Sequence, residues 1–247
     1  MIKLDKIYKS ESVDKQPEID FDKNNKKRPS WVRIILDKTI IFVKILFNNE
    51  AFWYRRYFRD YFFPLENTSE DYRNYYDEIA KDYENYIPQN KNMAKIILDF
   101  LKELKINKNS KILDLGAGTG IVTEGIVNAG YKNTALLDIS KEELKIAKSK
   151  ENLKNSKFIV ADLTKDEIKE KFDVIFETMS LDYFNGDQLA SILLKIKSAL
   201  NNGGIFIVID RHVYPEFNKF FIEMKKGKIS LETPEGIFEY YYFVGKN

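Results

Sequence analysis

The chain has no cysteine and only one histidine among its 247 residues. The lack of cysteine excludes disulfides, thiolate metal ligands and a cysteine nucleophile. A single histidine argues against a histidine-based metal cluster, so we expect no metal cofactor. The formal net charge of +2 argues against a strongly basic nucleic-acid binder, although it leaves room for a local basic patch.

Long hydrophobic runs are also scarce. The first residues, 1–6, lack the continuous apolar core of a signal peptide. An aromatic-rich run begins at Trp31, but Asp37, Lys38 and Lys44 interrupt it, so it does not provide the roughly 20 predominantly apolar residues that cross a bilayer. We therefore expect a cytoplasmic location. With 44% hydrophobic and 32% charged residues, the chain suffices for one α/β domain and an appended segment.

The composition changes within the first 70 residues. Residues 1–29 are polar, and we expect a disordered tail because such a segment buries too little apolar surface. Residues 30–70 are predicted to form a basic-aromatic helical extension. Within it, residues 31–63 are open to three interpretations: helices packed on the following domain, a surface lying on a membrane, or a contact surface for RNA or a protein. Packing is favoured because aromatic rings are usually buried, and peripheral membrane contact is the strongest alternative.

The most informative stretch is KILDLGAGTG, residues 111–120, an apolar run that ends in three alternating glycines. Backbone approaches a bulky ligand closely only where no Cβ intervenes, and such turns often need a positive φ. Residues 121–129 then show apolar residues at helical spacing. A strand, a glycine turn and a helix predict the first half of a Rossmann-like unit. The spacing G-x-G-x-G departs from the dinucleotide pattern G-x-G-x-x-G, which disfavours a dinucleotide.

Two further apolar runs end in acids. Residues 134–138 end in Asp138, which can accept hydrogen bonds from both hydroxyls of a ribose, and residues 158–162 end in Asp162, suitably placed for an adenine amine. For any single acid, a helix cap or a solvating charge explains the residue about equally well. With Asp114 in the first run, however, each of three successive strands ends near an acid, and chance explains this poorly.

In this combination the chain resembles the class I S-adenosylmethionine-dependent methyltransferases of small-molecule type, from residue 111 to about residue 243, with a lead-in from Tyr72. The resemblance implies S-adenosyl-L-methionine as co-substrate. It also implies an α/β fold with a Rossmann-like, seven-stranded, mostly parallel sheet, helices on both faces and a C-terminal antiparallel hairpin. Such a hairpin separates this fold from a dinucleotide-binding dehydrogenase. Residues 71–247 are expected to form this domain, with cap helices over residues 71–110.

The resemblance also assigns roles to residues. Asp114 is expected near the amino acid end of the cofactor, Asp138 at the ribose and Asp162 at the adenine amine. Tyr76 and Tyr83 are candidates to close over the methionine end, but tyrosines seven residues apart share a helical face, which fits ordinary packing equally well. The expected cofactor contacts are Tyr76, Tyr83, Asp114, Gly116, Ala117, Gly118, Gly120, Asp138, Ile139, Asp162, Leu163 and Glu177.

Methyl transfer requires few catalytic groups from the protein. The sulfonium already activates the methyl group, so the protein mainly has to align the two reactants. If a base is needed, the candidate catalytic residue is His212, which follows the fifth predicted strand and titrates near working pH. A surface or capping histidine is the competing interpretation. Glu177 and Asp210 are weaker candidates, and Arg211 is a candidate to bind an anionic group.

After the fourth predicted strand the chain reads Glu177-Thr-Met-Ser180, without the Asn/Asp-Pro-Pro-Tyr/Phe motif of many enzymes that methylate amino groups of bases or glutamine. We therefore predict methyl transfer to an O, N or C atom of a small or amphipathic molecule. One alternative is an RNA or protein methyltransferase that uses Arg55, Arg56 and Arg59. Another is a non-catalytic S-adenosylmethionine-binding subunit of a partner complex.

Overall fold

The computed structural model describes residues 68–247, apart from residues 87–89, 185, 212–213 and 234–235. The predicted tail and nearly all of the predicted helical extension lie outside these residues, as does His212, the candidate base. Within the described part of the chain, no helix is long and apolar enough to span a membrane.

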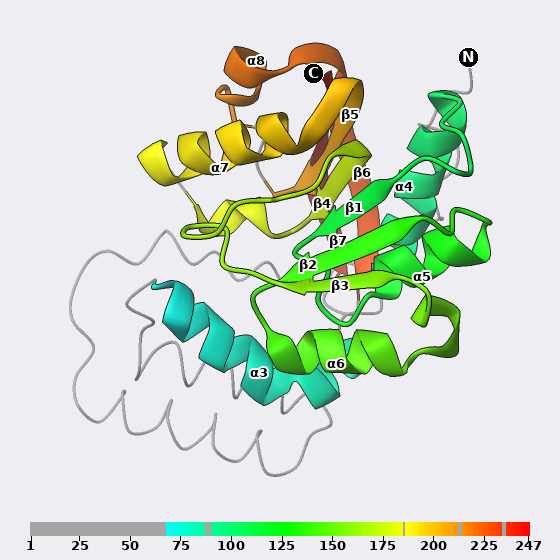
Figure 1. The fold of residues 1–247 in the computed structure, drawn as a ribbon, viewed down its shortest axis with the longest axis vertical. Helices are drawn as coiled ribbons and strands as arrows, with labels where there is room; N and C mark the ends of the chain where they lie inside the picture. The colour runs from blue at the N-terminus through cyan, green and yellow to red at the C-terminus, as the bar shows by residue number, and fades with distance from the viewer. Residues whose placement is uncertain (1–67, 87–89, 185, 212–213, 234–235) are drawn as a thin grey trace. The chain divides into compact units, whose positions relative to one another are not determined.

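The centre of the domain is a seven-stranded sheet in the order β3-β2-β1-β4-β5-β7-β6 (Figure 1). The strands are β1 (Ile112–Leu115), β2 (Thr134–Asp138), β3 (Lys157–Val160), β4 (Phe172–Thr178), β5 (Leu200–Asp210), β6 (Ile222–Thr233) and β7 (Gly236–Lys246). Strands β1 to β5 pair in parallel, whereas β7 runs antiparallel to both β5 and β6. The predicted mostly parallel sheet with a C-terminal antiparallel hairpin is confirmed.

Helices cover both faces of this sheet, as predicted (Figure 1). They are α3 (Ser69–Tyr86), α4 (Asn90–Glu103), α5 (Ile121–Asn128), α6 (Lys141–Ser149), α7 (Gly186–Ala199) and α8 (Phe217–Phe220), with the short 3-10 helices η2 (Glu151–Leu153) and η3 (Leu181–Tyr183). Successive side chains of a strand point to opposite faces. Ile112 of β1 therefore joins the core under α4 and α5, while its neighbour Leu113 joins the core under α7.

Two strands begin earlier than their local sequence predicts. The pattern predicts a helix through Leu200, a stop over residues 201–204 and a strand from Ile205, but β5 begins at Leu200, directly after α7. Its first residue pairs with Phe172 of β4 through an irregular register. Strand β6 begins at Ile222, six residues before the predicted start at Lys228, because it pairs with the end of β7. Both extensions depend on a distant partner strand.

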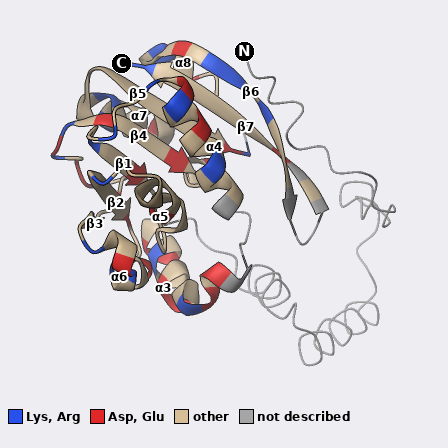
Figure 2. Cartoon of the chain, turned by 90° about the vertical axis from the view of Figure 1, so that its right-hand side faces the viewer, with Lys and Arg blue, Asp and Glu red and all other residues tan. Residues whose placement is uncertain are grey.

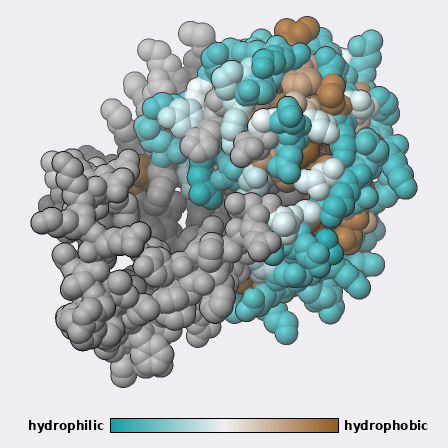
Figure 3. Space-filling model, turned by 90° about the vertical axis from the view of Figure 1, so that its left-hand side faces the viewer, coloured by the Kyte–Doolittle hydropathy of each residue, from teal (hydrophilic) through white to brown (hydrophobic). Residues whose placement is uncertain are grey.

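Strand β6 forms one edge of the sheet and carries several cations, seen in blue in Figure 2. The Nζ atoms of three of its lysines lie within 3.1 Å of a carboxylate oxygen; the pairs are Lys225–Glu103, Lys226–Glu223 and Lys228–Glu239. Charged side chains on an edge strand oppose pairing with another sheet. On the face shown in Figure 3, the described surface is mainly hydrophilic, with apolar residues in scattered groups.

Candidate functional site

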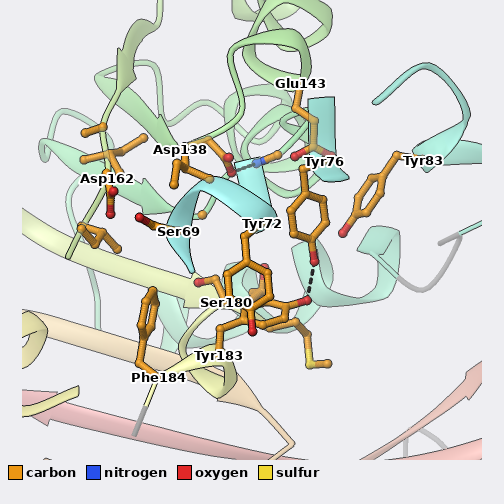
Figure 4. Close-up of a pocket in the computed structure, with 18 residues that line it drawn as sticks. Ser69, Tyr72, Tyr76, Tyr83, Asp138, Glu143, Asp162, Ser180, Tyr183 and Phe184 are labelled. Carbon is orange, nitrogen blue, oxygen red and sulfur yellow. Dashed lines mark hydrogen bonds between the residues drawn. The ribbon is translucent and has the colours of Figure 1, made fainter. Parts of the chain in front are cut away.

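A cavity lies at the carboxyl ends of β1, β2 and β4, where open α/β sheets bind their ligands (Figure 4). The empty space between its walls is about 750 Å³, including space that is open to solvent. Its lining comprises Ser69, Tyr72, Tyr76, Tyr83, Gly116, Gly118, Leu137, Asp138, Ile139, Glu143, Ala161, Asp162, Leu163, Thr178, Met179, Ser180, Tyr183 and Phe184. Eight of the residues predicted from the sequence are among them.

The glycine turn after β1 forms the floor of this cavity. Gly116 has a φ of +72°, and a Cβ at this position would lie 2.5 Å from the Cβ of Ser180, so the turn tolerates only glycine here. The backbone N–H of Gly118 donates a 2.7 Å hydrogen bond to Oδ2 of Asp138. The turn is thereby fixed against the end of β2.

Asp138 lies at the end of β2 and faces the cavity beside Ile139. Its Oδ1 accepts a 2.8 Å hydrogen bond from the N–H of Ser140, and its Oδ2 accepts the bond from Gly118. Burial raises the pKa of Asp138, and these backbone hydrogen bonds oppose that shift. Because each carboxylate oxygen has two lone pairs, Asp138 retains capacity to accept further hydrogen bonds from a ligand.

Asp162 lies on the cavity wall with Leu163, in the loop after β3 rather than at the strand's end as predicted, because β3 stops at Val160. Its Oδ1 accepts hydrogen bonds from the N–H and the hydroxyl of Thr164, at 2.9 and 2.6 Å. Burial raises the pKa of Asp162, but the hydrogen bonds, led by that of the Thr164 hydroxyl, outweigh burial and lower it to about 2. The group is therefore an ionised acceptor at neutral pH.

Aromatic side chains form the opposite wall. The hydroxyls of Tyr76 and Tyr183 share a hydrogen bond, drawn as a dashed line in Figure 4. The ring of Tyr183 also lies 4.7 Å from that of Tyr72, and the ring of Tyr76 lies 6.1 Å from that of Tyr83, measured between centroids. These contacts connect α3 to η3 across the cavity.

Helix α3 is held in this place by α6 (Figure 1). Oδ1 of Asp77 accepts hydrogen bonds from the hydroxyl of Ser140 and from the N–H of Glu142, at 2.7 and 3.1 Å. Further along α3, Oε1 of Glu84 lies 2.6 Å from Nζ of Lys150. Polar contacts at both ends of α6 thus orient the helix that carries Tyr76 and Tyr83.

The buried side chain of Glu177, whose exposed fraction is 0%, binds the loop after β4 through hydrogen bonds. Oε2 of Glu177 accepts 2.9 Å hydrogen bonds from both the N–H and the hydroxyl of Ser180. Burial, followed by the charge of Asp210, raises the pKa of Glu177 well above its ordinary value. Met179, between Glu177 and Ser180 in the sequence, has a φ of +63°, which is strained for a residue with a side chain. This loop therefore presents Met179 and Ser180 to the cavity.

Four predicted cofactor contacts do not line the cavity: Asp114, Ala117, Gly120 and Glu177. Gly120 instead allows close packing, since a Cβ there would lie 2.8 Å from Cδ1 of Leu153 and 2.9 Å from Cδ2 of Leu136. Ala117 contacts the same apolar cluster. In this structure these two residues and Glu177 support the turn and the loop, and their contact with a cofactor stays a prediction.

Asp114 lies beneath the turn with an exposed fraction of 1%. Its Oδ2 accepts a hydrogen bond from the hydroxyl of Thr123 in α5. Burial raises the pKa of Asp114 to about 7, against the opposing effect of that hydrogen bond. In this structure the residue links α5 to β1, and its predicted place near the amino acid end of the cofactor stays a prediction.

The candidates for proton transfer and anion binding also lie off the cavity wall. Asp210 is buried at the end of β5, and burial together with Asp182 raises its pKa to about 7. Nε of Arg211 lies 3.1 Å from Oδ2 of Asp182, which compensates its charge. Among the residues that the structure describes, no group of three His, Cys, Asp or Glu side chains is suited to hold a metal ion.

One acidic residue of the cavity was not predicted from the sequence. Glu143, in the first turn of α6, lines the cavity with an exposed fraction of only 2%. Ser140 and Glu143 form the pattern S-x-x-E, which is typical of a capping box and so offers a purely local explanation for the acid. Tyr72, Tyr183 and Phe184 also line the cavity and were not named as contacts from the sequence.

Comparisons with known proteins show similarity to methyltransferases. Residues 112–204 match the family model described as "Methyltransferase domain". Malonyl-[acyl-carrier protein] O-methyltransferases of Bacillus anthracis and Bacillus cereus are 29% and 30% identical to the chain over 151 residues, which are 59% of this chain and 55% of each relative. The chain thus spans about half the length of the curated relatives it matches.

Among solved structures, magnesium protoporphyrin IX methyltransferase from Synechocystis PCC 6803 with bound SAM superposes with a TM-score of 0.60. The match covers 74% of this chain and 98% of that one, at 14% sequence identity, which shows a shared fold. Residues 112–204 match a methyltransferase domain, in agreement with the family resemblance recognised from the sequence.

Proposed function

We propose that this chain is an S-adenosylmethionine-dependent methyltransferase that acts on an O, N or C atom of a small or amphipathic molecule. One observation carries the proposal: a single cavity is lined by the glycine turn, by Asp138 with Ile139, and by Asp162 with Leu163. These residues come from the ends of three neighbouring strands. They offer the backbone surface, the ribose acceptor and the adenine-side acceptor that a nucleoside cofactor requires.

In this proposal the cofactor supplies an activated methyl group, and the protein's residues position it. Ionised Asp162 accepts from the adenine amine, and Asp138 accepts from the ribose. Gly116 and Gly118 let the ligand lie directly on the turn. Alignment and exclusion of water then account for most of the required rate enhancement.

The acceptor molecule is proposed to enter on the aromatic side, between α3 and η3. Tyr72, Tyr183 and Phe184 offer rings that suit an apolar or amphipathic acceptor, while the tyrosine hydroxyls offer hydrogen bonds. Cofactor and acceptor would then meet over Ser180, which lies against Gly116. The relatives' names favour one variant, an acceptor carried on a protein, because those of Bacillus act on malonyl-[acyl-carrier protein].

A methyl-transfer assay tests this function. The full chain would be incubated with S-adenosylmethionine labelled in its methyl group, together with small carboxylic acids, phenols, amines and malonyl-carrier protein. We expect label in one class of acceptor, and a loss of turnover in Asp138→Ala. The matched control is Asp82→Ala, an exposed position of α3 away from the cavity lining. Cofactor binding without turnover on any acceptor would favour the non-catalytic subunit.

A further inference from the structure

One carboxylate oxygen of a buried acid in the cavity wall has no hydrogen-bond partner among the described residues. Oε1 of Glu143 is inaccessible to solvent and receives no hydrogen bond from any described residue. Burying a carboxyl group without a partner is unfavourable. The apolar neighbours on the same helix, Leu144 and Ala147, pack in the core without such a cost. Stability alone would therefore favour an apolar residue at position 143.

The ordinary structural role of this glutamate is already taken by another residue. In a capping box the glutamate side chain accepts from the N–H of the N-cap residue. Here the N–H of Ser140 donates instead to Oδ1 of Asp138, at 2.8 Å. The hydroxyl of Ser140 still caps α6 by accepting from the N–H of Glu143, at 3.1 Å. The helix is thus capped without the carboxyl group of Glu143, which remains directed at the cavity.

Glu143 and Asp138 meet at the same residue of the glycine turn. The N–H of Gly118 donates to Oδ2 of Asp138, and a Cβ on Gly118 would lie 3.5 Å from Oε2 of Glu143. Figure 4 shows both acids in the part of the cavity next to Tyr76. A ligand group bound to Asp138 above Gly118 is therefore within reach of Glu143. Burial, and then the charges of Asp138 and Asp77, raise the pKa of Glu143.

We propose that Glu143 is a second ribose-binding residue, which forms a hydrogen bond with one of the two ribose hydroxyls while Asp138 binds the other. The inference rests on the proposed function, in which Asp138 binds the ribose. Two acids in contact with one turn match the two adjacent hydroxyls of a ribose. The bound hydroxyl would supply the partner that Oε1 of Glu143 lacks among the described residues.

The test combines changes in the residue with changes in the ligand. S-adenosylhomocysteine and its 2′-deoxy and 3′-deoxy analogues would be titrated into the wild-type chain, Glu143→Leu and Glu143→Gln. Removing the hydrogen bond in Glu143→Leu should weaken S-adenosylhomocysteine binding about tenfold or more. Glu143→Gln keeps an acceptor oxygen and should lose less. The matched control is Glu142→Gln, whose side chain is partly exposed and pairs with Lys145.

The decisive result is non-additivity. The wild-type chain should bind both deoxy analogues more weakly than S-adenosylhomocysteine. In Glu143→Leu, this difference in affinity should largely disappear for one of the two analogues, because the hydroxyl that it lacks has no partner in the variant. The thermal midpoint of Glu143→Leu should rise at the same time, since an unpartnered buried carboxyl group is removed. If Glu143→Leu does not fold, Glu143→Ala, which also removes the acceptor, carries the same comparison with the analogues.

Two results would overturn the inference. If both analogues lose the same factor in the variant as in the wild type, Glu143 does not touch a hydroxyl. If the wild-type chain fails to bind S-adenosylhomocysteine, the proposed function and this inference fall together. The two failures are distinguishable because the first occurs in a protein that binds the parent ligand.

Discussion

Single residues of the site divide between those that face the cavity and those that support it. Asp138 and Asp162 offer acceptor oxygens to the cavity, whereas Asp114 and Glu177 are buried beneath it and bind the protein's own hydroxyl and N–H groups. Acidic residues therefore serve two different roles in this part of the domain. The distinction depends on which way a side chain points, and it has testable consequences for stability.

Asp114→Asn should change the pH dependence of stability. The pKa of Asp114 is about 7 in the folded chain against 3.8 ordinarily, so between these values the folded state holds a proton that the unfolded state has lost. The free energy of unfolding therefore falls as pH rises through this window, by a few kcal/mol from this residue. Asparagine cannot ionise, so the variant should gain stability relative to the wild type from pH 4 to pH 7.

This difference is measured by urea unfolding of the ligand-free wild type and variant at several pH values. Other acids contribute equally to both proteins and cancel in the difference. A stability difference that stays constant across the window would show that Asp114 has an ordinary pKa.

Gly120→Ala should destabilise the domain through packing as well as through the backbone. Gly120 has a φ of +78°, and an added Cβ would lie 2.8 Å from Leu153 and 2.9 Å from Leu136. We expect a loss of roughly 2–4 kcal/mol, the sum of an unfavourable φ and overpacking. The control is Gly130→Ala, where φ is +97° but the nearest contact is an ordinary 3.8 Å to Lys108.

Unfolding by urea compares these two glycines. Gly130→Ala should show only the backbone cost, of about 1 kcal/mol. Equal losses in the two variants would contradict the packing role that we assign to Gly120.

At the scale of elements, α3 is the part that connects the cavity to the surface of the domain. Its inner residues Tyr76 and Tyr83 reach the cavity, while Asp77 and Glu84 hold it to α6. Few of these contacts are apolar and buried, so we expect α3 to open more readily than the sheet.

Asp77→Ala should loosen α3. It removes the acceptor for the Ser140 hydroxyl and for the Glu142 N–H. We expect faster amide hydrogen exchange across residues 69–86 and a several-fold weaker affinity for S-adenosylhomocysteine, because α3 then closes over the ligand less often. The matched control is Asp82→Ala on the same helix. Unchanged exchange in Asp77→Ala would mean that the aromatic contacts alone hold the helix.

The elements of the sheet were predictable from sequence because hydrophobic periodicity is a local signal. Strand β2 has the predicted bounds, and α5 begins at the predicted residue. The early starts of β5 and β6 were not predictable, since Leu200 and Ile222 owe their strand conformation to partners distant in sequence. Glu143 was not predicted because its local pattern is that of a capping box. Only the structure shows that the N–H of Ser140 donates to Asp138 instead, which leaves the carboxyl group of Glu143 at the cavity.

At the scale of the whole molecule, our central proposal is that the ends of β1, β2 and β3 form a nucleoside site for a methyl donor. The sheet order with its antiparallel β7 and the match of residues 112–204 to the methyltransferase domain support the class. The placement of Asp138 and Asp162 on one cavity supports the ligand. Residues before Asn67 lie outside the described part of the chain, and the three interpretations of residues 31–63 stay predictions.

Calorimetric titration of the full chain with S-adenosylhomocysteine tests this claim most directly, with NAD as the control ligand. The account predicts micromolar binding of S-adenosylhomocysteine, no binding of NAD, and at least a tenfold loss in Asp138→Ala, whose charge-assisted hydrogen bonds to the ribose are removed. Binding of NAD in preference, or an Asp138→Ala variant that binds S-adenosylhomocysteine as well as the wild type, would contradict it.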